Sequence, residues 1–89
     1  MSKIIIKDNK VTPQDVEDSI VKEEYTKLGT KMTACVLTLV NGYEVVGLAG
    51  VVDPKTYDIK IGGPIARGNA LDKVWDHLSS ILQNTLADA

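Results

Sequence analysis

The residues of this 89-residue chain that could do covalent chemistry are few and lie far apart. Catalysis needs a nucleophile with a base, a pair of carboxylates in a dry cleft, or a bound metal. Cys35 lies in an apolar run typical of a buried thiol, and His77 lies beside Asp76 at the border of a helical pattern. One cysteine and one histidine cannot form the usual shell of a zinc site. We therefore expect no enzyme, no metal and no cofactor.

The sequence offers a stronger candidate for anion binding than for catalysis, namely Arg67. It is the only arginine and lies about one turn into a predicted helix, where a guanidinium can fork onto a phosphate or carboxylate; a solvated surface residue is the alternative. Glycines 62, 63 and 68 surround the start of that helix, but the stretch matches neither the dinucleotide fingerprint nor the P-loop. A hinge and helix cap is favoured there over a phosphate loop.

Aromatic side chains and overall charge narrow the class of ligand. Tyr43 and Tyr57 are expected to be accessible and able to stack a base, whereas Trp75 is expected in the core. The net charge is −2 and the basic groups form no stripe, so binding of bulk nucleic acid is not expected. No apolar stretch reaches the length of a membrane span, and residues 1–7 are too short for a signal peptide. We expect an intracellular protein with no membrane contact.

The N-terminal part predicts an arm and one short helix. Three isoleucines at positions 4–6 favour an edge strand or an arm that becomes ordered against a neighbour, and the residues do not separate these alternatives. Thr12 as N-cap, Pro13 in the first turn and Asp15 at the positive end of the dipole predict a helix over residues 12–23. Its narrow apolar stripe needs only a shallow contact.

Residues 31–53 predict an antiparallel hairpin, because β-branched residues dominate and Glu44 is the only charge from Met32 to Val52. Asn41 and Gly42 predict a two-residue primed turn, which pairs residue 40 with 43 and residue 36 with 47. Both faces of this hairpin are apolar. The second face therefore has to be covered by another part of the chain or by another copy.

Residues 64–84 predict a long helix packed on the hairpin sheet. Pro64 fits a first turn, and Gly63 with Pro64 is expected to break or restart any helix that comes from further upstream. Ala66 and Ala70 lie one turn apart and allow a close backbone approach. We predict a single α+β domain over 1–89. A chain this short buries little surface, so we expect a homo-oligomer, as a dimer or higher.

The hairpin and the long helix together carry a resemblance to a known family. The chain resembles a family of small tailed-phage proteins that includes the Thoeris anti-defence sponges, which sequester cyclic ADP-ribose signals of bacterial immunity. The resemblance covers about residues 31–82. It rests on these residues: Thr33, Cys35, Val36, Leu37, Thr38, Leu39, Asn41, Gly42, Tyr43, Val46, Gly47, Val52, Asp53, Pro54, Ile61, Gly62, Ile65, Ala66, Asn69, Ala70, Lys73 and Trp75.

The resemblance implies a phage protein of the host bacterial cytoplasm that sequesters an immune signalling nucleotide, of the cyclic ADP-ribose type or a cyclic oligonucleotide, without catalysis. In such a sponge a tyrosine would stack a base and basic side chains would meet phosphates. The candidate ligand-binding residues are Tyr43, Asp53, Tyr57, Lys60, Arg67 and Lys73. The alternative is a protein-interaction module that inhibits a host protein through its apolar sheet face.

Overall fold

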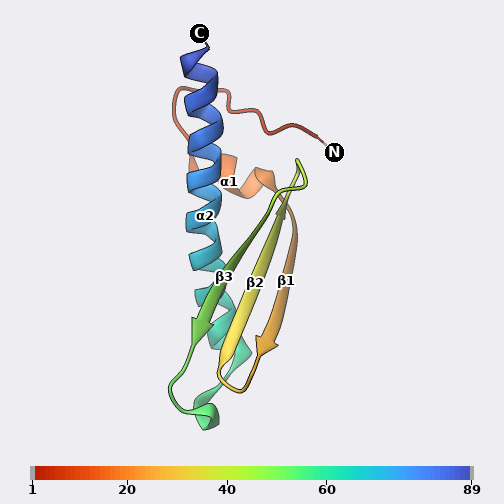
Figure 1. Cartoon of the computed structure of the whole chain (residues 1–89), viewed down its shortest axis with the longest axis vertical. Coiled ribbons are helices and arrows are strands. Elements are labelled where there is room, and N and C mark those ends of the chain that lie inside the picture. The colour runs from red at the N-terminus through yellow and green to blue at the C-terminus, as the bar shows by residue number, and fades with distance from the viewer. Residues whose placement is uncertain (1, 89) are drawn as a thin grey trace.

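The computed structural model describes residues 2–88 and shows a three-stranded antiparallel sheet with one long helix packed along it (Figure 1). The strands stand in the order β1-β2-β3. The predicted α+β class, with a short N-terminal helix and a long C-terminal helix on the sheet, is confirmed. The elements are α1 (Pro13–Ser19), β1 (Ile20–Leu28), β2 (Met32–Leu39), β3 (Glu44–Gly50), the 3-10 helix η1 (Pro54–Thr56) and α2 (Ile59–Ala87).

Helix α1 begins as predicted but ends earlier. The Thr12 hydroxyl accepts from the Asp15 amide at 3.1 Å, and the Asp15 carboxylate accepts from the Thr12 amide at 2.9 Å. The prediction that this helix continues to residue 23 is wrong, because the chain turns into β1 at Ile20. Residues 20–28 pair along β2, and these ladder hydrogen bonds outweigh the helical propensity of the Lys-Glu-Glu segment at 22–24.

The predicted hairpin at 31–53 is present, with its register shifted by one residue. Cys35 pairs with Gly47 and Leu37 with Val45, so the loop is three residues long, at 40–42. A primed two-residue turn needs positive φ at both central residues, but Gly42 (φ 88°) alone adopts it. The Asn41 side chain instead accepts from the Tyr43 amide at 3.0 Å. The shift turns every side chain of β3 to the face opposite the predicted one.

Helix α2 is longer than predicted. It begins at Ile59, capped by the Asp58 side chain, which accepts from the Lys60 amide at 2.9 Å, and it runs to Ala87. The predicted range of 64–84 and the predicted break at residues 63–64 are therefore wrong. Pro64 is the sixth helical residue, so its missing amide removes a single backbone hydrogen bond, to the Lys60 carbonyl.

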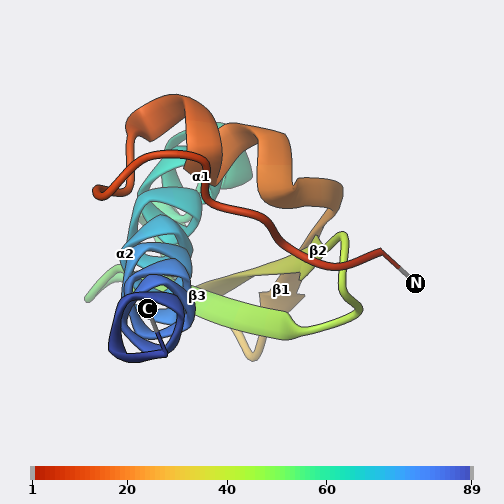
Figure 2. The ribbon, with the colours of Figure 1, turned by 90° about the horizontal axis from the view of Figure 1, so that it is seen from above.

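Between α2 and the sheet lies the core, where the predicted close approach is confirmed. Ala66 and Ala70 are fully buried and face Gly47 of β3; a Cβ at position 47 would collide with the Ala66 carbonyl oxygen and the Ala70 amide nitrogen. The predicted buried thiol, Cys35, is also fully enclosed. Seen along the long axis, α2 runs beside the sheet while α1 closes one end (Figure 2). The main buried cluster is Val16, Cys35, Leu37, Leu39, Val45, Ala49, Ala66, Ala70, Val74 and Leu78.

Residues 2–10 form no strand or helix, so the edge-strand alternative is wrong. The Ser2 amide donates to the Val40 carbonyl at 3.1 Å, beside the β2–β3 loop. Ile4 and Ile6 pack, partly buried, against the core, while Ile5 points outward and is 74% exposed. The segment thus lies across one end of the sheet within its own chain.

The other face of the sheet has no helix against it in either view (Figures 1 and 2). Its exposed apolar side chains include Leu28, Met32, Val46 and Leu48. The second face thus carries apolar side chains, as expected, but no helix within residues 2–88 provides the expected cover.

Candidate functional site

Arg67 lies where α1, β1 and α2 meet. Its Nε donates to Glu23 Oε1 and one terminal nitrogen donates to Glu17 Oε2, both at 2.9 Å. Hydrogen bonds to Glu23 and Glu17 raise the pKa of Arg67, and the Arg67 guanidinium holds the pKa of Glu23 below its ordinary value. Two carboxylates thus occupy the fork that was expected to meet phosphate. A ligand at this place would have to displace one of them, and the residue holds three elements together instead.

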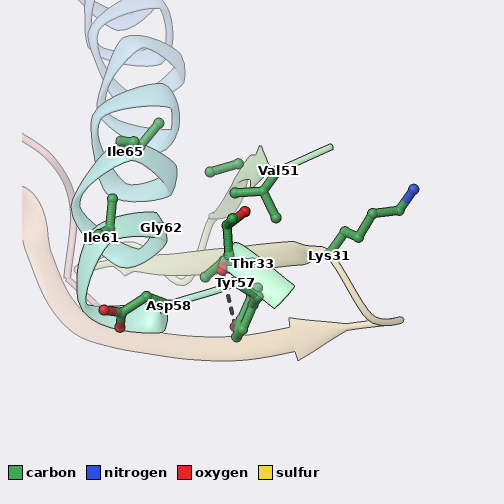
Figure 3. Close-up of a pocket in the computed structure, with 11 residues that line it drawn as sticks. Lys31, Thr33, Val51, Tyr57, Asp58, Ile61, Gly62 and Ile65 are labelled. Carbon is green, nitrogen blue, oxygen red and sulfur yellow. Dashed lines mark hydrogen bonds between the residues drawn. The ribbon is translucent and has the colours of Figure 1, made fainter. Parts of the chain in front are cut away.

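Tyr57 lies at the opposite end of the sheet from α1, over a small cavity (Figure 3). Its hydroxyl accepts from Thr33 Oγ1 at 3.1 Å, and Lys27 Nζ lies 4.5 Å from its ring centroid. The cavity measures about 40 Å³, which suits a water molecule and not a nucleotide. Nearby, the Asp53 side chain accepts from the Lys55 amide at 2.9 Å and caps η1. Lys60 is exposed in the first turn of α2.

Tyr43 and Lys73, by contrast, line one groove between β3 and α2, with a volume of about 490 Å³. The ring of Tyr43 stacks on the ring of His77, with centroids 3.9 Å apart and planes 5° from parallel. Lys73 Nζ donates to the Val46 carbonyl at 2.6 Å. The groove is lined by Tyr43, Glu44, Val45, Val46, Lys73, Asp76 and His77.

The polar atoms of this groove are only partly used. An ammonium group has three donors, so Lys73 keeps two after its bond to the Val46 carbonyl. His77 Nε2 is buried and has no hydrogen-bond partner among residues 2–88. Glu44 and Asp76 add carboxylate acceptors at the rim. The arrangement can stack an aromatic ring on the half-exposed Tyr43, donate to one anionic group and accept from amino or hydroxyl groups.

The structure therefore distributes the six predicted site residues over three places. Tyr43 and Lys73 come together, Tyr57 with Asp53 and Lys60 stays at the η1 end, and Arg67 is paired elsewhere. The sequence reasoning missed Glu44, Asp76 and His77 as members of the groove. Lys73 and His77 are four residues apart on one helix and so share a face, a signal the sequence did carry.

Two classes of site find no support in the part of the chain that is described. Within residues 2–88, no three histidine, cysteine, aspartate or glutamate side chains come close enough together to hold a metal ion. No helix in the same range has the length and apolar character needed to cross a bilayer.

Taken together, these features define a small α+β protein in which one long helix covers one face of a three-stranded sheet. Residues 11–86 match the model of the phage protein (N4 Gp49/phage Sf6 gene 66) family, and the chain belongs to that family. Neither a curated protein nor a solved structure matches the chain. The expected membership of a phage protein family is thereby confirmed, whereas the relation to Thoeris sponges stays a prediction.

Proposed function

We propose that this phage protein binds a small nucleotide in the groove between β3 and α2 and withholds it without changing it. The observation that carries the proposal is that Tyr43, from the segment before β3, meets Lys73 and His77 of α2 in one groove. A volume of about 490 Å³ lies in the range of small-molecule sites, roughly 300–1,000 Å³. In an infected bacterium such binding would lower the free concentration of an immune signal.

The charges of the groove restrict which nucleotide fits. Lys73 is its one cation, while Glu44 and Asp76 repel an anion that carries several charges. The pyrophosphate of cyclic ADP-ribose and the two phosphodiesters of a cyclic dinucleotide carry one negative charge per phosphate, fewer in all than a linear triphosphate, and one ammonium group can meet one of them. The two carboxylates suit the ribose hydroxyls and the amino group of a base. A cyclic ADP-ribose type of signal or a cyclic dinucleotide therefore fits better than a linear triphosphate.

The proposed mode is sequestration and not turnover. No serine, threonine or cysteine is among the residues that line the groove, so no aliphatic hydroxyl and no thiol nucleophile lines it. His77 is stacked flat on Tyr43, which holds its ring in place by contact and not by a carboxylate that would orient it as a base. Recovery of an unchanged ligand is the corresponding expectation.

A thermal-shift panel tests the proposal. Cyclic ADP-ribose isomers and cyclic dinucleotides are added at about 100 times the dissociation constant, which stabilises a binding protein by roughly 2.7 kcal/mol. For a chain of this size that corresponds to an increase in melting temperature of roughly 10 °C or more. Lys73→Met should abolish the shift, while Lys60→Met, an exposed lysine of the same helix, should retain it.

Ligand released by heating should then elute unchanged on chromatography. A panel that produces no shift with the native protein rejects the proposal. So does a shift that survives Lys73→Met and disappears with Lys60→Met, because the ligand would then lie at the η1 end of the molecule.

The exposed apolar face of the sheet favours a second candidate, a module that binds and inhibits a host protein. Val46 and Leu48 are 39% and 46% exposed on this face, as side chains of a contact surface would be. Under this reading Leu48→Asp removes the inhibition of the host target, and Lys73→Met leaves it intact. The two candidates thus respond to opposite variants.

A further inference from the structure

Strand register arranges the open face of the sheet in four rows, each formed by one residue from each strand. One row is polar; in the other three the residues of β2 and β3 are apolar, while β1 contributes Glu24, Thr26 and Leu28. Because paired residues on one face lie side by side, the rows follow directly from the pairing. From the polar end the rows are Lys22–Thr38–Glu44, Glu24–Val36–Val46, Thr26–Ala34–Leu48 and Leu28–Met32–Gly50.

The outer residues of the polar row carry opposite charges on opposite edges of the sheet. Lys22 lies on β1 and Glu44 lies on β3, with Thr38 between them. Within the chain Lys22 Nζ contacts Glu24 at 3.2 Å, and Thr38 Oγ1 donates to Glu44 at 3.3 Å. Both contacts are exposed, and neither joins Lys22 to Glu44.

We infer that a second copy of this chain packs on the open face, related by a two-fold axis that runs parallel to β2 in the interface. Such an axis exchanges left and right and leaves each row at its own height. β2 therefore meets β2 of the second copy, and β1 meets its β3. Lys22 then lies opposite Glu44 of the second copy at two symmetric points. Glu24, the intrachain partner of Lys22, comes opposite Val46 at the edge of the face, and the two rows furthest from Lys22 meet their own copies.

Other symmetric arrangements fit the face less well. A two-fold axis perpendicular to the strands reverses the order of the rows and brings Lys22 toward Leu28 and Glu44 toward Gly50 of the second copy, so neither charge meets an opposite charge of that copy. Addition of a strand at the β3 edge is blocked, because Lys73 and Asn69 already donate to the outward carbonyls of Val46 and Leu48. Two-fold face-to-face packing is also the ordinary way in which two sheets bury their apolar sides.

The open face is small for a stable interface. Strands of seven residues on β3, at about 3.3 Å per residue and about 4.8 Å apart, give a flat footprint of roughly 300 Å² per copy. This is smaller than the roughly 800 Å² per partner of a standard interface. We therefore expect a dimer whose dissociation constant is on the order of 10 µM, with monomer present at lower concentration.

Charge reversal tests the arrangement through mixing. In Lys22→Glu and in Glu44→Lys each homodimer places like charges opposite one another at two points, so each variant should dimerise about tenfold more weakly or worse. In a mixture of the two variants, every such contact pairs opposite charges. Sedimentation and native mass spectrometry, with one variant labelled with nitrogen-15, should show a heterodimer about as stable as the native dimer.

The mixing step separates contacts between copies from contacts within one chain. A salt bridge between Lys22 and Glu44 of the same molecule could be rescued only by the double variant, never by mixing two single variants. Circular dichroism of each variant, taken below the dissociation constant, should match that of the native chain and so show that the fold is unchanged.

Apolar substitutions provide the matched control. Leu48→Asp, on the face, should yield monomer at every concentration, whereas Val52→Asp, at a side chain that is 93% exposed beyond the end of β3, should dimerise like the native chain. Native protein that stays monomeric at roughly 100 times the expected dissociation constant overturns the inference. A mixture without preference for the heterodimer overturns the direction of the axis.

Discussion

The contact between β3 and α2 at Gly47 leads to the sharpest prediction for stability, through the substitution Gly47→Ala. The added Cβ would collide with the Ala66 carbonyl oxygen and the Ala70 amide nitrogen. Both are backbone atoms of a helix, so neither can move aside as a flexible side chain does. Helix and strand would have to separate along the part of the core where Ala66 and Ala70 are fully buried.

The magnitude follows from the cost of overpacking. Extra methyl groups in packed cores cost roughly 1–3 kcal/mol, and a clash with rigid backbone belongs at the upper end. The gain from restricting the unfolded chain, about 0.4–1 kcal/mol for glycine to alanine, offsets part of this. We expect a net loss of about 2–3 kcal/mol in the free energy of unfolding. A small domain has roughly 5–15 kcal/mol in all, so the variant should still fold.

Urea unfolding followed by circular dichroism measures the loss. With a slope of about 1 kcal/mol per molar for a small chain, the unfolding midpoint should fall by roughly 2–3 M. Gly68→Ala is the first control: a Cβ at position 68 meets nothing within 4 Å, and alanine is the better helix former, so stability should rise by about 0.5–1 kcal/mol. Gly50→Ala is the second, since its Cβ meets the flexible Met32 thioether.

A Gly47→Ala variant within about 0.5 kcal/mol of the native protein would refute the reasoning, because surface substitutions commonly fall in that range. A loss at Gly50 as large as that at Gly47 would also refute it. In that case the cost would reflect alanine in β3 in general and not the approach of the helix.

Two predictions concern ionisation. Since the pKa of Glu23 is lowered in the folded state from an ordinary 4.5, its contribution is present near neutral pH and is lost as the pH falls through the folded value. Arg67→Met should therefore lower the free energy of unfolding by about 1 kcal/mol at pH 7, a figure that allows for the 24% and 35% exposure of the Arg67 and Glu23 side chains. The loss should be smaller in acid, and urea midpoints measured across pH test both values. Burial, with the hydrogen bond to Glu23, raises the pKa of Tyr25 to about 12, so its stabilising contribution is lost as the pH rises from 10 toward 12. Tyr25→Phe should remove the highest step of a spectrophotometric tyrosine titration, and an unchanged titration would contradict this assignment.

The sequence predicted the elements that depend on neighbouring residues. It did not predict those that depend on contacts with distant parts of the chain. The capping box at Thr12 and Asp15, the presence of the hairpin and the long helix all follow from neighbours in the chain. Strand β1 does not, because eight of its nine residues are exposed and show no alternation of burial. Its charged sequence suits a helix, and only pairing with β2 makes it a strand.

The site shows the same division. Arg67 has the donor geometry for phosphate, but its partners come from α1 and β1, and β1 was not expected. Tyr43 meets His77 because the three-residue loop places residue 43 directly before β3, beside the middle of α2. A shift of one residue in register decides which side chains of β3 face the helix and which face outward.

The residues behind the resemblance to phage proteins have structural roles that say little about the ligand. The spacing of helix and sheet depends on Gly47, Ala66 and Ala70. Asp53 caps η1, and the Asn69 side chain donates to the Leu48 carbonyl at the edge of β3. Of the polar groups in the groove, Tyr43 and Lys73 belong to that set, whereas Glu44, Asp76 and His77 do not.

Under the proposed function, the residues of the resemblance would supply a scaffold with an aromatic ring and one cation, and the other three side chains would select its ligand. Glu44 has a further part, because the inferred two-fold axis brings Lys22 of a second copy to it and adds a cation at the rim of the groove. Dimer formation would then reduce the repulsion that Glu44 exerts on a phosphate. By linkage, a ligand that prefers the dimer must strengthen it by the same factor, so the native protein should dimerise more tightly with ligand bound, and Lys22→Glu should weaken both events.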